Sequence, residues 1–95
     1  MRIENPDDYT FVKFEVSSSK GKKYDAILKN KLTGRTKKVS FGAKGMEQYK
    51  DSTGLGKYTN ANHNDPVRRA LYRKRHAGEE KHKFSSGWFA WHYLW

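Results

Sequence analysis

The sequence has no cysteine. Without thiols, neither disulfide bonds nor thiolate metal ligands are possible, and packing must stabilise the fold. No run of apolar residues approaches the roughly 20 that a membrane span requires, and residues 1–8 lack the apolar stretch of a signal peptide. We therefore expect a protein without a membrane span that is not secreted by a signal peptide, in an intracellular setting.

Acidic residues are also scarce. The chain has 20 Lys and Arg against 10 Asp and Glu, which gives a formal net charge of +10 over 95 residues. This balance indicates an anionic partner, although a surface that only keeps the protein soluble explains the same composition. The length allows one domain with a small core, and an aromatic content of 15% supplies rings to fill it.

Three segments show strand features after an N-terminal extension over residues 1–8. Residues 9–16 alternate in polarity, with Val12, Phe14 and Val16 on one face and Phe11, Lys13 and Glu15 on the other. A second alternating segment begins at Tyr24, and a third runs from Arg35 to Phe41 after a loop that contains Gly34. Residues 9–41 therefore predict a three-stranded antiparallel meander.

A helix is predicted after a long irregular segment. Glycines punctuate residues 42–64, and such a loop in a small domain is expected to be functional or fixed by a partner. Asp65 and Pro66 indicate a helix start and Gly78 a helix end, so the helix spans residues 65–77. Val67 and Leu71, spaced at i and i+4, predict a narrow buried edge on an otherwise cationic helix.

The last segment, residues 84–95, is an aromatic tail with three tryptophans. Exposed, it would be a solubility liability, so we expect it to be buried in its own core or in a neighbouring subunit. The candidate core or interface aromatics are Phe41, Trp88, Trp91 and Trp95. The predicted fold class is α+β, with a small three-stranded antiparallel sheet, one basic helix and a short aromatic C-terminal segment.

Cations gather in the predicted hairpins and in the helix. Three interpretations of them remain open, namely a solvated surface, a site for an anionic polymer such as nucleic acid, and a site for an acidic protein surface. The candidate residues for binding a partner or nucleic acid are Lys20, Lys22, Lys23, Lys37, Lys38, Arg68, Arg69, Tyr72, Arg73, Arg75 and His76.

Catalytic patterns are missing. His63, His76, His82 and His92 match no metal-ligand spacing, and no motif places a base beside a serine nucleophile. The segment 42–45 is too short for a phosphate-binding loop and lacks its Lys-Ser/Thr ending. We therefore predict a protein that is not an enzyme and has no catalytic, metal or cofactor site.

Several short strings together resemble a known family. They are Ser40-Phe41-Gly42-Ala43-Lys44-Gly45, Gln48-Tyr49-Lys50-Asp51, His63-Asn64-Asp65-Pro66 with Arg68-Arg69, Tyr72 and Arg75-His76, Gly87-Trp88-Phe89, and Tyr93-Leu94-Trp95. Over roughly residues 23–95 the chain resembles a family of small uncharacterised basic proteins of large double-stranded DNA viruses of algae and protists. The resemblance implies viral origin and localisation in the virion or the infected host cell.

Two function hypotheses follow. The first is a non-enzymatic virion structural protein, a minor capsid or cement component that binds neighbouring capsid proteins through its loop, basic helix and aromatic tail. The second is a sequence-nonspecific nucleic-acid-binding protein that lays its basic hairpin and helix on phosphates, with double-stranded DNA as one partner. A continuous cationic face favours the second hypothesis, and cations scattered around an ordered loop and tail favour the first.

Overall fold

A computed structural model describes residues 5–95 of the chain. Residues 1–4 of the predicted N-terminal extension lie outside the described residues, and its remainder holds the 3-10 turn η1 (Pro6–Asp8). The strands are β1 (Tyr9–Val16), β2 (Lys22–Asn30) and β3 (Thr36–Ala43). The helices are α1 (Pro66–Arg75) and α2 (Ser86–Tyr93), and two further 3-10 turns are η2 (Thr59–Ala61) and η3 (Glu79–Lys81).

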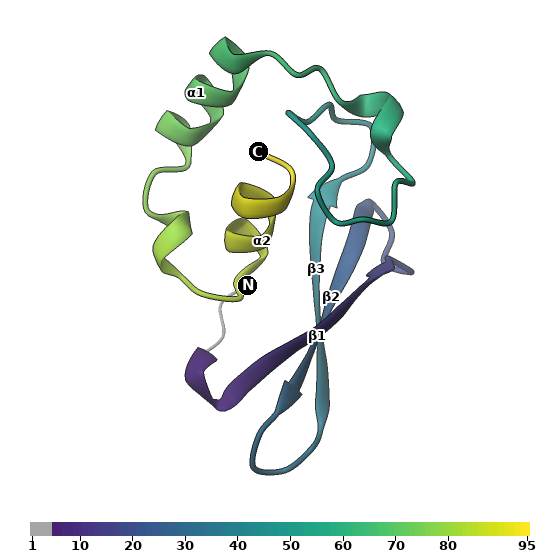
Figure 1. Ribbon diagram of the computed structural model, residues 1–95, viewed down its shortest axis with the longest axis vertical. Coiled ribbons are helices and arrows are strands. Elements are labelled where there is room, and N and C mark those ends of the chain that lie inside the picture. The colour runs from purple at the N-terminus through teal and green to yellow at the C-terminus, as the bar shows by residue number, and fades with distance from the viewer. Residues whose placement is uncertain (1–4) are drawn as a thin grey trace.

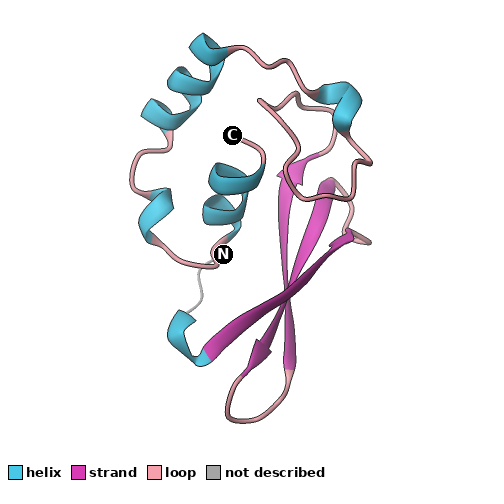
Figure 2. Cartoon of the chain, viewed as in Figure 1, coloured by secondary structure: helices cyan, strands magenta, loops and turns pink. Residues whose placement is uncertain are grey.

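The three strands form an antiparallel sheet in the order β1-β2-β3, which confirms the predicted meander and α+β class (Figure 2). Tyr24, Ala26 and Leu28 of β2 point to one face together with Val39 and Phe41 of β3, and all are fully buried or nearly so. Alternate positions of two adjacent strands therefore build half of the core.

The prediction for the faces of β1 is wrong at Val12. The pairing with β2 shifts between Phe11 and Lys13, so Val12 is the extra residue of a β-bulge. Phe11 consequently opposes Leu28, on the same face as Phe14, and the two rings lie 4.7 Å apart. Val12 is left 48% exposed, because an inserted residue reverses the face of those before it.

The aromatic tail forms helix α2, which the sequence analysis described only as a segment. Ser85 begins it by accepting a hydrogen bond from the Trp88 backbone N–H at 3.0 Å. Phe89 is fully buried against Phe41, with stacked rings 5.4 Å apart, and Leu94 is also buried. The tail therefore closes the core of its own chain, with α2 between the sheet and α1 (Figure 1).

The loop between β3 and α1 is fixed by its own chain, although the sequence left a partner open as the cause. Gln48 is buried, and its side-chain amide donates to the Tyr58 carbonyl at 3.0 Å and to Asn62 Oδ1 at 2.8 Å. Asp51 accepts a short hydrogen bond from the Tyr24 hydroxyl. These bonds tie the loop to itself and to β2.

Helix α1 begins where the sequence predicts, because the Asp65 carboxylate caps the Val67 N–H at 2.9 Å and Pro66 occupies the first turn. The predicted buried edge is wrong, since Val67 is 67% and Leu71 is 47% exposed. Packing of Tyr72 against Trp95 holds the helix instead. Within residues 5–95, no helix has the length and hydropathy needed to cross a membrane.

Candidate partner-binding groove

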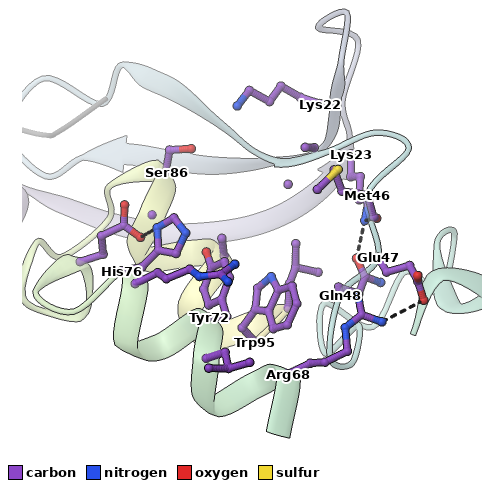
Figure 3. Close-up of a pocket in the computed structure, with 18 residues that line it drawn as sticks. Lys22, Lys23, Met46, Glu47, Gln48, Arg68, Tyr72, His76, Ser86 and Trp95 are labelled. Carbon is purple, nitrogen blue, oxygen red and sulfur yellow. Dashed lines mark hydrogen bonds and ion pairs between the residues drawn. The ribbon is translucent and has the colours of Figure 1, made fainter. Parts of the chain in front are cut away.

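A groove of about 740 Å³ lies between α1 and the packed end of the sheet, which is the end where Lys22 of β2 pairs with Ala43 of β3 (Figure 3). Small and apolar residues of β3, of α2 and of the position after α2 line it, namely Gly42, Ala43, Gly87, Ala90 and Leu94. Leu71 of α1 and Met46 of the loop also line it, and they are 47% and 64% exposed. The groove thus presents apolar surface to solvent beside α1, whose sequence is densely basic.

Two pairs of polar side chains lie close together in the groove. Arg68 Nη1 lies 3.5 Å from Glu47 Oε2, and His76 Nδ1 lies 3.0 Å from Glu79 Oε2. Lys22 and Arg75 also line the groove and are exposed. Neither lies within 4.0 Å of a carboxylate of residues 5–95, so these two cations are available to a partner.

Lys23 is a correction to the predicted binding set, because its side chain is only 2% exposed. Its ammonium group donates to the Met46 carbonyl at 2.6 Å and to Gln48 Oε1 at 2.7 Å (Figure 3). Burial lowers the pKa of Lys23 from its usual 10.5, and the nearby Asp51 carboxylate opposes that shift. Lys23 therefore fixes the loop that carries Met46 and does not contribute a surface charge.

Tyr72 forms a wall of the groove through an aromatic stack. Its ring lies parallel to the Trp95 indole, with centroids 4.2 Å apart and 3° between planes, and its other neighbour is the His76 ring at 4.2 Å. Burial, assisted by the Glu79 carboxylate, raises the pKa of the Tyr72 hydroxyl to about 12. The stack attaches α1 to the end of the chain.

Arg69 and Arg73, predicted as partner contacts, face the tail instead. Arg69 Nε and Arg73 Nη2 donate to the Trp95 carbonyl oxygen at 2.7 and 3.2 Å. The Arg69 guanidinium lies 4.8 Å from the Tyr49 ring centre, and that of Arg73 lies 5.0 Å from Trp91. These two cations anchor α1, and Trp91 and Trp95 are partly buried beneath them.

The remaining predicted lysines do not join the groove. Lys37 opposes Leu28 and Lys38 opposes Ile27, so the two side chains lie on opposite faces of the sheet. Their positions on β3 are about 20 Å along the strand from Ala43, which pairs with Lys22. Lys20 is exposed in the turn that precedes Lys22. The structure therefore divides the predicted cations among several surfaces.

Phe41 and Trp88 complete the predicted aromatic set. Phe41 is fully buried, as predicted for a core residue, whereas Trp88 is partly buried, with its ring 5.0 Å from that of Phe89. The sequence analysis missed Met46, Glu47, Glu79 and Gly87 as groove residues. A Cβ at Gly87 would lie 2.6 Å from the Glu79 carboxyl carbon, a closeness that no pattern in the sequence predicts.

His63, one of the four histidines that match no metal-ligand spacing, has a structural role. His63 Nδ1 accepts a hydrogen bond from the Asp65 backbone N–H at 2.9 Å, and its ring lies 5.1 Å from that of Trp95. In the part of the chain that the structure describes, no three His, Asp or Glu side chains are grouped to hold a metal ion.

Comparisons with known proteins give a family without an assigned function. The model of the family of unknown function DUF5754 matches residues 12–76, which cover most of the sheet, the loop and α1. No curated protein and no solved structure matches the chain.

Proposed function

We propose that this chain, which belongs to the DUF5754 family, is a non-enzymatic virion structural protein, a minor capsid or cement component. Its attachment point to a neighbouring protein is the groove between α1 and the packed end of the sheet. The observation that carries the proposal is that three exposed apolar side chains, Val67, Leu71 and Met46, lie in or beside one groove, whereas Val12, Val16, Leu32 and Leu55 are exposed away from it.

Exposed apolar side chains beside a recess are typical of protein contact sites. Val67 and Leu71 lie one helical turn apart on α1, and Leu71 opens onto the groove. An apolar edge of a helix in so small a domain would ordinarily be buried in its core. Here α1 is anchored through Tyr72, Arg69 and Arg73, which leaves that edge available to a partner.

The viral setting rests on the resemblance of the short strings described above. All five of those strings contribute residues to the groove, namely Gly42 and Ala43, Gln48, then Arg68, Tyr72, Arg75 and His76, then Gly87, and last Leu94 and Trp95. Segments distant in sequence therefore share one surface. A contact site for a partner would explain why residues of these strings line the same groove, and for this reason we place the proposed partner in the groove.

The test is incorporation into particles of the encoding virus. A groove variant, Leu71→Ser with Arg75→Gln, is compared with a control variant, Leu32→Ser with Lys38→Gln, whose two positions are also exposed. We expect quantitative mass spectrometry of purified particles to show at least about a tenfold loss for the groove variant, and wild-type levels for the control. Equal incorporation of both variants, or absence of the wild-type chain from particles, would reject the proposal.

A second candidate function is nonspecific binding to nucleic acid, which the net charge of +10 favours. Lys13 and Lys38 flank Ile27 across the outer face of the sheet, two positions from Lys29. Binding to a random duplex is measured over a salt series, where each neutralised phosphate contributes about −0.9 to the slope of log K against log salt. Strong binding near physiological salt with a steep slope would favour this candidate, and weak binding would favour attachment to protein.

A further inference from the structure

We infer that the groove binds an acidic, amphipathic peptide segment of the partner, with an apolar side chain placed against Leu71 and Leu94 and carboxylates at Lys22 and Arg75. The inference rests on the proposed function and names the chemistry of what the groove holds.

Charge selects an acidic occupant. Glu47 is already paired with Arg68, and Glu79 Oε2, which lies 3.0 Å from His76 Nδ1, is buried and not exposed to an incoming carboxylate. Lys22 on β2 and Arg75 on α1 approach the groove from two different elements and carry no ion pair within the described residues. A second copy of this chain is a poor occupant, because its own net charge is +10.

The lining provides a place for an apolar side chain. Gly87 and Ala90 of α2, Leu94 directly after it and Leu71 of α1 all line the groove. A Cβ at Gly42 would lie 2.9 Å from Leu94 Cδ1, so the space above Leu94 depends on this glycine. A volume of about 740 Å³ accommodates a few side chains, within the range of about 300 to 1,000 Å³ found for ligand pockets.

The apolar surface continues beyond the groove, which favours a peptide over a small molecule. Val67 does not line the groove, yet it lies one turn from Leu71 and is 67% exposed. A segment that lies along α1 with apolar residues at i and i+4 would contact both. A small dicarboxylate would reach Lys22 and Arg75 and leave Val67 uncovered.

The probe is a fluorescein-labelled peptide of about fourteen residues, with leucines recurring every three or four positions among glutamates. Its counterpart has glutamine in place of every glutamate. Binding is measured by fluorescence anisotropy and mapped by amide chemical shifts of the isotope-labelled full chain. We expect shifts at Gly42, Leu71 and Gly87, affinity at least about tenfold lower for the glutamine peptide, and a similar loss for the variant Leu71→Ser with Arg75→Gln.

The control variant Leu32→Ser with Lys38→Gln should bind the glutamate peptide as the wild type does. Three results would overturn the inference. They are amide chemical-shift changes confined to other surfaces, equal affinity for the glutamate and glutamine peptides, and displacement of the peptide from the same residues by a nucleic-acid duplex. If the glutamate peptide does not bind while the groove variant is still lost from particles, the partner segment is not acidic and the attachment function stands. If the peptide binds while the groove variant is incorporated normally, the attachment function fails and the binding chemistry stands.

Discussion

Lys22 and Lys23 are adjacent in β2 and have opposite environments. Lys22 is exposed at the groove, whereas Lys23 is buried and bonds to the Met46 carbonyl and to Gln48. A buried cation is tolerated when its hydrogen bonds are made, and it then fixes the groups that accept them. At this scale a basic run in the sequence contains both a binding residue and a structural one.

Replacing Lys23 with methionine should destabilise the fold. The Met46 carbonyl and Gln48 Oε1 would lose their ammonium donor inside the protein, at a cost of about 1 to 3 kcal/mol. The matched control is Lys22→Met at the exposed neighbour, which should change the free energy of unfolding by less than about 0.5 kcal/mol. Urea unfolding of both variants measures the difference, and equal stability of the two would contradict the assigned role of Lys23.

The lowered pKa of Lys23 also predicts a pH dependence. The folded state holds this proton less tightly than the unfolded chain, in which lysine titrates near 10.5. Between the folded-state pKa and 10.5 the unfolded state therefore binds more protons, and stability rises with pH. The unfolding free energy of the wild type minus that of Lys23→Met should increase with pH on the alkaline side as 10.5 is approached, whereas a constant difference would exclude the shift.

At the scale of elements, the β-bulge in β1 decides which aromatic side chains enter the core. Strict alternation would place Val12 with Phe14, but the bulge puts Phe11 there. The Phe11 ring lies 6.1 Å from that of Phe89 on α2, which adds a second aromatic contact to that of Phe14, whose ring lies 4.7 Å from Tyr93. One inserted residue thus sets how β1 and α2 meet.

A pair of alanine substitutions tests this register. Phe11→Ala should lower the unfolding free energy by about 2 kcal/mol or more, because an aromatic ring in contact with the core is removed. Val12→Ala, at a position 48% exposed, should cost less than about 0.5 kcal/mol. Regular alternation predicts the reverse order, so chemical denaturation of the two variants decides between the registers.

Helix α1 shows how an element can form without the packing that its sequence suggests. Its start is determined locally by Asp65 and Pro66. Its attachment depends on Trp95, more than twenty residues away, through stacking on Tyr72 and hydrogen bonds from Arg69 and Arg73. Because these long-range polar and aromatic contacts hold the helix, Val67 and Leu71 remain exposed.

For the molecule as a whole, the end of the chain completes the core that the sheet begins. Phe89 is fully buried and Leu94 is 2% exposed, and burial of each such side chain contributes about 1.5 to 3 kcal/mol. Small domains have a total stability of only about 5 to 15 kcal/mol. Helix α2 therefore supplies a large share of what holds the protein folded.

Truncation after Gly87 should abolish cooperative unfolding. Without residues 88–95, Phe41 and Val39 would lose the cover of Phe89 and Leu94. Near-ultraviolet circular dichroism and thermal unfolding measure the loss, with Trp91→Ala as a full-length control that should remain folded. A truncated chain with a sharp unfolding transition would show that the sheet and α1 suffice.

The sequence by itself determined the features that depend on local pattern. Alternating polarity predicted the meander, Asp65-Pro66 predicted the start of α1, and the aromatic richness of residues 84–95 predicted a buried tail. Helix capping and hydrophobic periodicity depend on residues close together in the chain, so the sequence alone is enough to predict the elements that they form.

Only the tertiary structure decided the bulge at Val12, the burial of Lys23, the exposure of Val67 and Leu71, and the groove itself. Each depends on residues far apart in the chain, such as Lys23 with Gln48 or Tyr72 with Trp95. The type of a side chain, charged or apolar, does not show whether residues distant in sequence will bury it. Whether a side chain is buried depends on the packing of the whole chain, because burial is determined by neighbours in three dimensions.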